Sequence, residues 1–296
     1  MIRLLASACV CVLLVAACSP VAPATDPVDE AGVEAAVEAA AAEAATAPEG
    51  FELSTERESE NYKVTAEIDP AILAFDPPLA WRLWKNADAQ LNELAVSADE
   101  GRRMADEDAA ATGNPSWFMG YTLDITHKAT VVLEDVISVS DMVGTYTGGA
   151  HPNYFLGGGI YRKGEEAALP LSAFVTDAAA FNDLVIKALV EEKIERGYEP
   201  MESASVEASL RELLVPSAEA PDVYTHNLLL AASTEPGKAG GITVVFSPYD
   251  IGAYAEGSYE VTIPADALTP ILTEAWAGRF GGLPVSQEDE LVIEEP

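Results

Sequence analysis

Few residues in this chain could do chemistry. The 296-residue sequence has three histidines, His127, His151 and His226, and three cysteines. No two histidines have the i, i+4 spacing of an HExxH zinc motif, and no GxSxG nucleophile motif occurs. His127 and His226 lie in β-type runs and are expected to be packed or at the surface. The sequence therefore predicts no metal site, no cofactor and no familiar catalytic set.

His151 is the one candidate for chemistry, because the turn around it is tightly specified. Gly148 and Gly149 allow positive φ, Pro152 fixes its own φ and favours an extended His151, and Asn153 can close a turn through its side chain. A histidine that ties this turn by hydrogen bonds explains the same residues. The sequence favours that structural role over a catalytic one.

A second turn-rich stretch, residues 246–257, follows about a hundred residues later. Its candidate binding or structural residues are Pro248, Tyr249, Asp250, Gly252 and Tyr254. We expect the two halves of one mixed domain to meet around these two loops. A nucleotide site is not expected, because Gly157-Gly158-Gly159 lacks the Lys and Ser/Thr that follow in a phosphate loop.

The N-terminal residues predict export and anchoring. Residues 1–17 carry one early charge, Arg3, and then an uncharged run that is too short to span a bilayer but suits a signal peptide. Small residues immediately before Cys18 resemble a bacterial lipobox, which predicts a lipid anchor on Cys18; an ordinary signal peptide containing cysteine is the alternative. Ser19 after the anchor points, by resemblance to known sorting rules, to an outer membrane and a chain facing the periplasm.

The flanking segments are predicted to be loose. Residues 18–54 are rich in Ala, Glu and Pro and cannot bury much apolar surface, so they read as a tether. Residues 285–296 read as an acidic tail. Between them we expect an N-terminal α+β half, 55–150, and a C-terminal α+β half, 151–284.

Periodicity predicts the elements that position the loops. Apolar alternation predicts strands near 62–68, 117–125, 129–139, 142–147, 154–161, 167–171, 223–231, 242–246 and 259–263. Helical spacing predicts helices near 79–111, 177–196 and 206–214, and a final helix opened by Pro264. Trp117 and Met119 are expected on the buried face of their strand, and Pro70, Pro77 and Pro78 are expected to break regular structure. The fold class is α+β, with largely antiparallel sheets and packed helices, the two halves forming one compact unit.

The two loops, in this order, resemble a bacterial envelope module. The residues that carry the resemblance are Gly148-Gly149-Ala150-His151-Pro152-Asn153, then Leu171-Ser172-Ala173-Phe174, Pro248-Tyr249-Asp250-Ile251-Gly252 and Val261-Thr262-Ile263-Pro264. They resemble the extracellular module of lysozyme-sensing anti-sigma factors of the RsiV type, shared with the non-catalytic N-terminal region of peptidoglycan deacetylases of the PdaC type. The similarity runs from about residue 61 to 280. Neither sigma-factor regulation nor deacetylation is expected, because the chain shows no cytoplasmic segment and no catalytic deacetylase motifs.

The net charge of the chain limits the classes of partner that it can bind. The chain has 49 acidic and 16 basic residues and a formal net charge of −33. Such a charge repels nucleic acid and anionic lipid, so membrane contact is expected through the anchor alone, and it attracts basic proteins. We therefore expect a non-catalytic binding lipoprotein whose partner is a basic lysozyme-type wall-cleaving enzyme or peptidoglycan. A wall-active enzyme using His151 with nearby carboxylates, or a structural envelope protein, are the alternatives.

Overall fold

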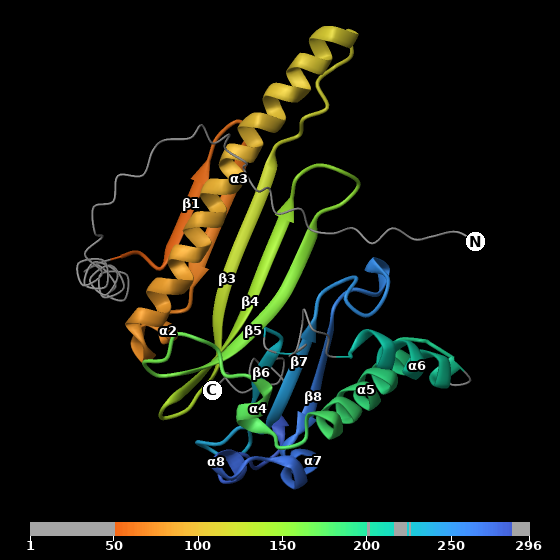
Figure 1. The fold of residues 1–296 in the computed structure, drawn as a ribbon. Helices are drawn as coiled ribbons and strands as arrows, with labels where there is room; N and C mark the ends of the chain where they lie inside the picture. Colours follow the sequence, from red (N-terminus) through yellow and green to blue (C-terminus); the bar gives the residue numbers. More distant parts are fainter. Residues whose placement is uncertain (1–50, 200–201, 216–223, 225, 286–296) are drawn as a thin grey trace, which may run out of the picture. The chain divides into compact units, whose positions relative to one another are not determined.

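The computed structural model describes residues 51–199, 202–215, 224 and 226–285 (Figure 1). The predicted signal peptide, Cys18, nearly all of the tether and the acidic tail lie outside these residues. Among the described helices, none combines the length and the apolar character needed to cross a bilayer.

The first sheet has five strands in the order β1-β2-β3-β4-β5. Along the chain, its elements are β1 (Ser54–Glu58), β2 (Tyr62–Ile68), α2 (Pro70–Phe75), α3 (Pro77–Thr112), β3 (Tyr121–Val132), β4 (Val136–Tyr146) and β5 (Asn153–Arg162). Helices α2 and α3 connect β2 to β3, which are therefore parallel, whereas the other neighbours are antiparallel. The three strands expected at 117–125, 129–139 and 142–147 are two antiparallel strands, β3 and β4. Both helices pack on one face of this sheet (Figure 1).

The prolines before α3 begin helices, so the expectation that they break every regular element was wrong. Pro70 follows the N-cap Asp69, whose carboxylate accepts a hydrogen bond from Ala71 N at 2.8 Å. Pro77 likewise follows Asp76, the N-cap of α3. Proline is tolerated in a first helical turn because its missing N–H would have no partner there. Pro70 thus lies at the turn from β2 into α2, and Pro77 at the turn from α2 into α3.

Strand β3 starts later than the alternation predicts. Gly120 has a φ of 84°, a left-handed conformation that interrupts the extended backbone just before Tyr121. The predicted buried face is therefore wrong for Trp117 and Met119, whose side chains are 54% and 82% exposed. The burial pattern is regular only from Tyr121 onward, with Leu123 and Ile125 in the core.

The second sheet is antiparallel, with strands in the order β8-β7-β6-β9. Its strands are β6 (Leu228–Ser233), β7 (Gly241–Phe246), β8 (Tyr259–Pro264) and β9 (Pro284–Val285). The helices of this half that precede β6 are α4 (Leu171–Phe174), α5 (Ala178–Glu195) and α6 (Ser203–Leu213). Helix α5 starts at the N-cap Asp177, which accepts a hydrogen bond from Ala180 N at 2.9 Å, and packs along β8.

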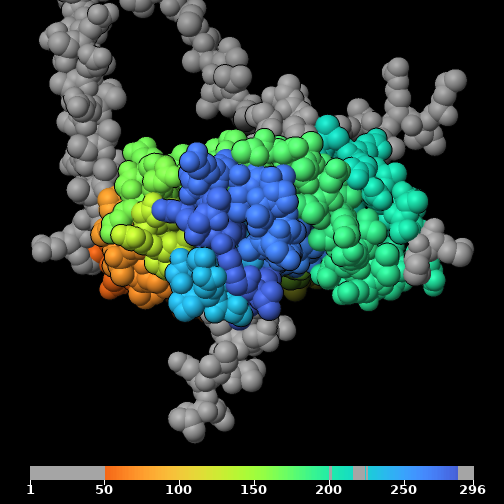
Figure 2. Space-filling view, turned by 90° about the horizontal axis from the view of Figure 1, so that it is seen from below, coloured from red at the N-terminus to blue at the C-terminus, as the bar shows by residue number. Residues whose placement is uncertain are grey.

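The single final helix predicted after Pro264 is replaced by three short pieces. These are α7 (Ala265–Leu268), η3 (Thr269–Ile271) and α8 (Glu274–Ala277). The interruption has a tertiary cause: Leu272 forms a β-bridge with Val175, and Thr176 N donates to Ile271 O at 2.7 Å. Arg279 after α8 also bonds Asp135 in the β3–β4 turn, at 2.6 Å. Figure 2 views this end, with the blue C-terminal segment lying against the yellow-green turn.

The two sheets share one core. Val131, Val136 and Ile160 of the first sheet belong to the same apolar cluster as the buried residues of the second sheet and of α5. Gly158 forms a parallel β-bridge with Asn227, and Gly158 N donates to His226 O at 2.8 Å. These contacts confirm the predicted α+β class and the joining of two halves into one unit.

Candidate functional site

The structure brings the two predicted loops together through an aromatic stack. The His151 ring lies on the Tyr254 ring, with centroids 4.0 Å apart and planes 20° apart. The Tyr254 hydroxyl donates to the Pro152 carbonyl at 2.7 Å, and His151 Nδ1 lies 2.9 Å from the same oxygen. A histidine protonated at Nδ1 satisfies this second contact. One carbonyl thus joins residues about a hundred positions apart.

The first loop has the backbone that its glycines predict. Gly148 and Gly149 have φ values of 96° and 105°, and the Tyr146 hydroxyl donates to Gly149 O at 3.2 Å. Asn153 begins β5 and pairs with Thr145. The loop is therefore the tip of the β4–β5 hairpin, with His151 exposed on it.

The second loop is held by its own polar side chains. Asp250 accepts a hydrogen bond from Ser247 N at 2.7 Å, on the turn that contains Pro248. The Ser247 hydroxyl accepts from Leu156 N at 2.9 Å and donates to Leu156 O at 3.2 Å. The loop is thus attached to β5, the strand that follows the His151 loop.

Tyr249 is the strained residue of this loop. Its φ is 77°, and it is the only non-glycine with positive φ among the described residues. Its side chain is 62% exposed, and its ring centroid lies 5.4 Å from that of Tyr254. An aromatic residue in this conformation costs on the order of 1–3 kcal/mol, so the surrounding contacts must stabilise it.

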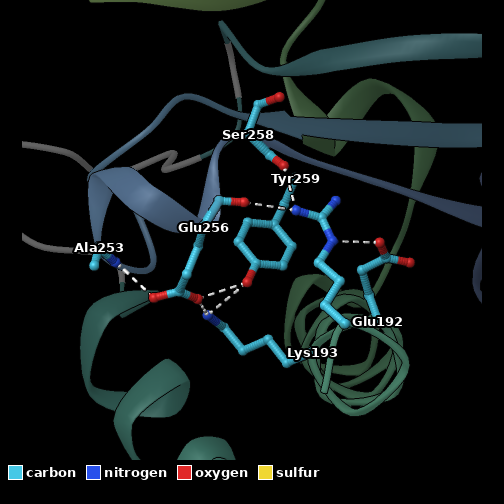
Figure 3. A network of polar contacts seen from close by, with 7 residues as sticks. Glu192, Lys193, Ala253, Glu256, Ser258 and Tyr259 are labelled. Atoms are coloured by element: carbon cyan, nitrogen blue, oxygen red, sulfur yellow. Dashed lines mark hydrogen bonds and ion pairs between the residues drawn. The ribbon is translucent and has the colours of Figure 1, made fainter. Parts of the chain in front are cut away.

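A buried charge network holds the C-terminal end of the second loop (Figure 3). The Glu256 carboxylate, at the end of η2 (Tyr254–Glu256), accepts hydrogen bonds from Ala253 N, from Lys193 Nζ and from the Tyr259 hydroxyl, at 2.7, 2.7 and 2.6 Å. Lys193 comes from the last turn of α5 and is 4% exposed. Gly252 makes room for the carboxylate, because a Cβ at that position would lie 2.6 Å from its oxygens.

Arg196, the residue that follows α5, also binds this segment. Its Nη1 donates to Glu256 O and to Ser258 O at 3.0 and 2.8 Å, and its guanidinium lies 4.0 Å from the Tyr259 ring centroid. Both carbonyls belong to the segment that leads from η2 into β8. Lys193 at the end of α5 and Arg196 just after it therefore hold the segment from Glu256 to Ser258.

The network shifts the pKa of both acidic groups in it. Burial acts to raise the pKa of Glu256, but hydrogen bonds from Lys193, Tyr259 and Ala253 N outweigh it and lower the pKa to about 2. Burial, together with the Glu256 carboxylate, raises the pKa of Tyr259 above its usual value. Glu256 is thus ionised and Tyr259 neutral throughout the physiological pH range.

Part of the site lies in a segment that comparison with known families picks out. Residues 237–266 match the family model described as protein of unknown function (DUF3298). This matched segment contains β7, the Tyr249 loop, η2 and β8. No curated protein matches the chain.

Two solved structures that carry the DUF3298 name are similar to this chain. One, from Bacteroides fragilis NCTC 9343, is 19% identical, has a TM-score of 0.49 and is aligned over 76% of this chain and 95% of that one. The other, from Pseudomonas aeruginosa PAO1, is 15% identical, has a TM-score of 0.41 and is aligned over 79% of this chain and 95% of that one. The resemblance to RsiV-type and PdaC-type modules stays a prediction.

Two further histidines lie apart from the loops. His127 is buried, and its Nδ1 lies 2.5 Å from the Asp141 carboxylate across the β3–β4 pair. Burial, followed by the charge of Asp141, raises the pKa of neighbouring Tyr161 to about 12. His226 is exposed in a turn before β6, not in a strand. Within the described residues, no three His, Cys, Asp or Glu side chains gather in a group that could hold a metal ion.

Sequence reasoning missed the supporting residues. Lys193 stands in the apolar stripe of α5, and an isolated lysine among buried positions is the signal that could have marked it. Its partner Glu256 lies 63 positions away, a pairing that helical periodicity cannot reveal. The His127–Asp141 pair depends on the register of β3 and β4 and was missed for the same reason.

Proposed function

We propose that this chain is a non-catalytic binding module of the bacterial cell envelope, and that its partner is a basic wall-cleaving enzyme of the lysozyme type. The observation that supports it most is the exposed Tyr249 ring, held in a strained conformation beside Tyr254. Tyrosines at interfaces supply a large contact area at a low entropy cost, and strained residues cluster at functional sites. The contact surface is formed by Tyr249 and Tyr254, and the His151 ring stacks on Tyr254.

The net charge favours a basic protein over peptidoglycan. A charge of −33 accelerates the association of cationic partners and gives no comparable attraction to an anionic or neutral wall polymer. Raising the salt concentration should slow association, because the Debye length falls from about 10 Å at 0.1 M to about 3 Å at 1 M. Binding to isolated wall sacculi with no binding to the enzyme would reverse this assignment of the partner.

The surroundings of His151 favour binding over catalysis. Its Nδ1 contacts the Pro152 carbonyl, and within the described residues no hydrogen bond or ion pair joins His151 to a carboxylate. A general base usually needs such an orienting partner. The alternative of a wall-active enzyme requires His151→Ala to abolish a turnover while the protein stays folded. We propose instead that His151 stabilises the loop.

We expect Tyr249→Gly to weaken binding without loss of stability. Glycine adopts a φ of 77° without strain, which offsets its greater freedom in the unfolded chain, so the free energy of unfolding should change by less than about 1 kcal/mol. Loss of the exposed ring should raise the Kd for a basic lysozyme-type enzyme by about tenfold or more. The affinity is measured by calorimetric titration of the variant and of the unaltered protein. Both are used as residues 51–285, which contain all described contacts and leave out nearly all of the tether and tail.

The control for this experiment is His151→Ala in the same fragment, residues 51–285. It should lower the free energy of unfolding by about 1 kcal/mol through the lost stacking on Tyr254, with binding retained. Equal enzyme affinity in Tyr249→Gly and the unaltered protein would show that the loop serves structure alone. Binding that unrelated basic proteins reproduce equally well would reduce the effect to a general polyanion attraction.

We further propose that Cys18 carries a lipid that holds the protein at the outer membrane, facing the periplasm. The supporting observation is the run of small residues before Cys18 at the end of an uncharged segment. Cys18→Ser in cells should abolish labelling by a fatty-acid probe and release the protein from the membrane fraction. A serine variant that still sediments with membranes would contradict lipid anchoring.

A further inference from the structure

Helix α3 extends well beyond the sheet that it covers. Gly101 lies against Tyr121, the first residue of β3: a Cβ on Gly101 would be 2.7 Å from the tyrosine hydroxyl. The helix continues to Thr112, so its last eleven residues project about 16 Å past the start of the strand, at a rise of 1.5 Å per residue. Figure 1 shows this end of α3 and the returning segment above the strands.

The returning segment, residues 113–120, is fixed on a face of small helix residues. Ala98 and Ala105 are fully buried, and the Phe118 ring lies 5.1 Å from that of Tyr121 and close to Gly101. A side-chain hydrogen bond from Ser116 to Asp106 contributes to lowering the pKa of that carboxyl, after the larger effect of Arg102. Together, the end of α3 from residue 96 and segment 113–120 form a projecting tip.

The tip exposes large apolar side chains to solvent. Trp117 and Met119 stand on either side of the inward Phe118 and are largely exposed, as is Met104 on the helix. Sequence alternation marks Trp117 and Met119 as buried, and the structure leaves them in solvent. Such conflicts between local pattern and structure are expected at functional sites, and an exposed tryptophan is a common anchor of protein interfaces.

The charge of the tip limits what can cover these side chains. Residues 96–120 contain five acidic and two basic residues. A second copy of the chain would bring the same excess of negative charge against itself, and anionic lipid would do the same. A protein with a basic surface around an apolar patch is the complementary occupant.

The tip lies at the same end of the sheet as the His151 loop. Thr122 near the start of β3 pairs with Tyr146 at the end of β4, so segment 113–120 and the β4–β5 hairpin tip leave the sheet at one end. Figure 1 shows both above the strands. One partner of enzyme size could therefore contact both.

We propose that the projecting tip is a second contact surface for the basic partner, with Trp117 and Met119 as its apolar anchors. This inference rests on the proposed function for the class of partner, and it assigns a surface that the two loops do not include. Glu100, Asp106 and Glu107 pair with Arg102 and Arg103 of the tip. The carboxylates that face basic residues of the partner are therefore Asp99 and Asp108. Two separated contacts would orient the bound enzyme relative to the sheet.

The test is the double variant Trp117→Ser, Met119→Ser in the full chain, titrated with a basic lysozyme-type muramidase. Loss of both anchors should raise the Kd about tenfold or more, with the thermal unfolding midpoint unchanged because both side chains are exposed. Val132→Ser is the matched control. Val132 is 51% exposed at the other end of β3, about 36 Å from Tyr121 at 3.3 Å per residue, and should leave the Kd unchanged.

The outcomes separate the two proposals. Muramidase that binds the unaltered chain, Val132→Ser and the double variant equally well would overturn the tip surface and leave the proposed function standing. Muramidase that binds none of them would overturn the proposed function and the tip with it. If Val132→Ser reproduces a tenfold or greater loss of affinity seen in the double variant, the effect is a nonspecific one of the surface. That result would also contradict the tip as a contact surface.

Discussion

Gly158→Ala is expected to lower the free energy of unfolding by about 2–3 kcal/mol, although it adds one methyl group. A Cβ at this position would lie 2.8 Å from Val139 O and 2.3 Å from the end of the Leu229 side chain. Leu229 can move, but the Val139 carbonyl belongs to β4, the neighbour of β5 in the same sheet, so these two strands must shift apart. Overpacking of a dense core typically costs about 1–3 kcal/mol, and Gly158 lies where both sheets contribute to one core.

Gly278→Ala provides the matched control. Gly278 has a φ of −87°, and nothing lies within 4 Å of the position that its Cβ would take. Alanine there should leave stability unchanged or raise it slightly, because it restricts the unfolded chain. Urea unfolding of the two variants compares them directly. Equal midpoints would show that β4 and β5 tolerate a wider separation at Gly158.

The sequence predicted the elements whose periodicity is uninterrupted. The strand expected at 62–68 is β2, and the helix expected at 177–196 is α5 with its N-cap. Strand β1 was missed because its residues are charged and polar, and its place depends on pairing with β2 along the sheet edge. The final helix failed because bridging of Leu272 to Val175 outweighs helix propensity. Local pattern thus fails where a long-range contact decides the backbone.

In the candidate site, too, local patterns could be predicted and long-range contacts could not. Glycine and proline chemistry locates both loops, because turn residues act within a few positions. The sequence did not reveal that Gly157 and Gly158 serve close packing, which depends on His226 and Leu229 lying against the strand. Lys193 was also missed, since the reason for burying a lysine is a carboxylate distant in the sequence.

Lys193→Met should lower the free energy of unfolding by about 3 kcal/mol. Methionine fills nearly the same space, but it leaves the Glu256 carboxylate, whose side chain is 18% exposed, without its cationic partner. Breaking a buried ion pair on one side costs about 3–5 kcal/mol, and here Tyr259 and Ala253 N retain part of the stabilisation. Lys187→Met is the control, because that lysine is exposed on the same helix with a distant ion-pair partner at 3.9 Å.

The pH dependence identifies the carboxylate responsible. The pKa of Glu256 is about 2 in the folded protein and 4.5 as its ordinary value, so its stabilisation is complete above about pH 4.5 and is lost as the pH falls through about 2. The shift corresponds to on the order of 3 kcal/mol, which solvent screening of the partly exposed carboxylate reduces. The stability difference between the unaltered protein and Glu256→Gln should therefore shrink between pH 5 and pH 2, measured as urea midpoints at each pH. A difference that stays constant over this range would show that Glu256 stabilises the loop by packing and not by charge. Because Glu256 holds the segment that carries Tyr254, Lys193→Met should also weaken partner binding at neutral pH, whereas Lys187→Met should not.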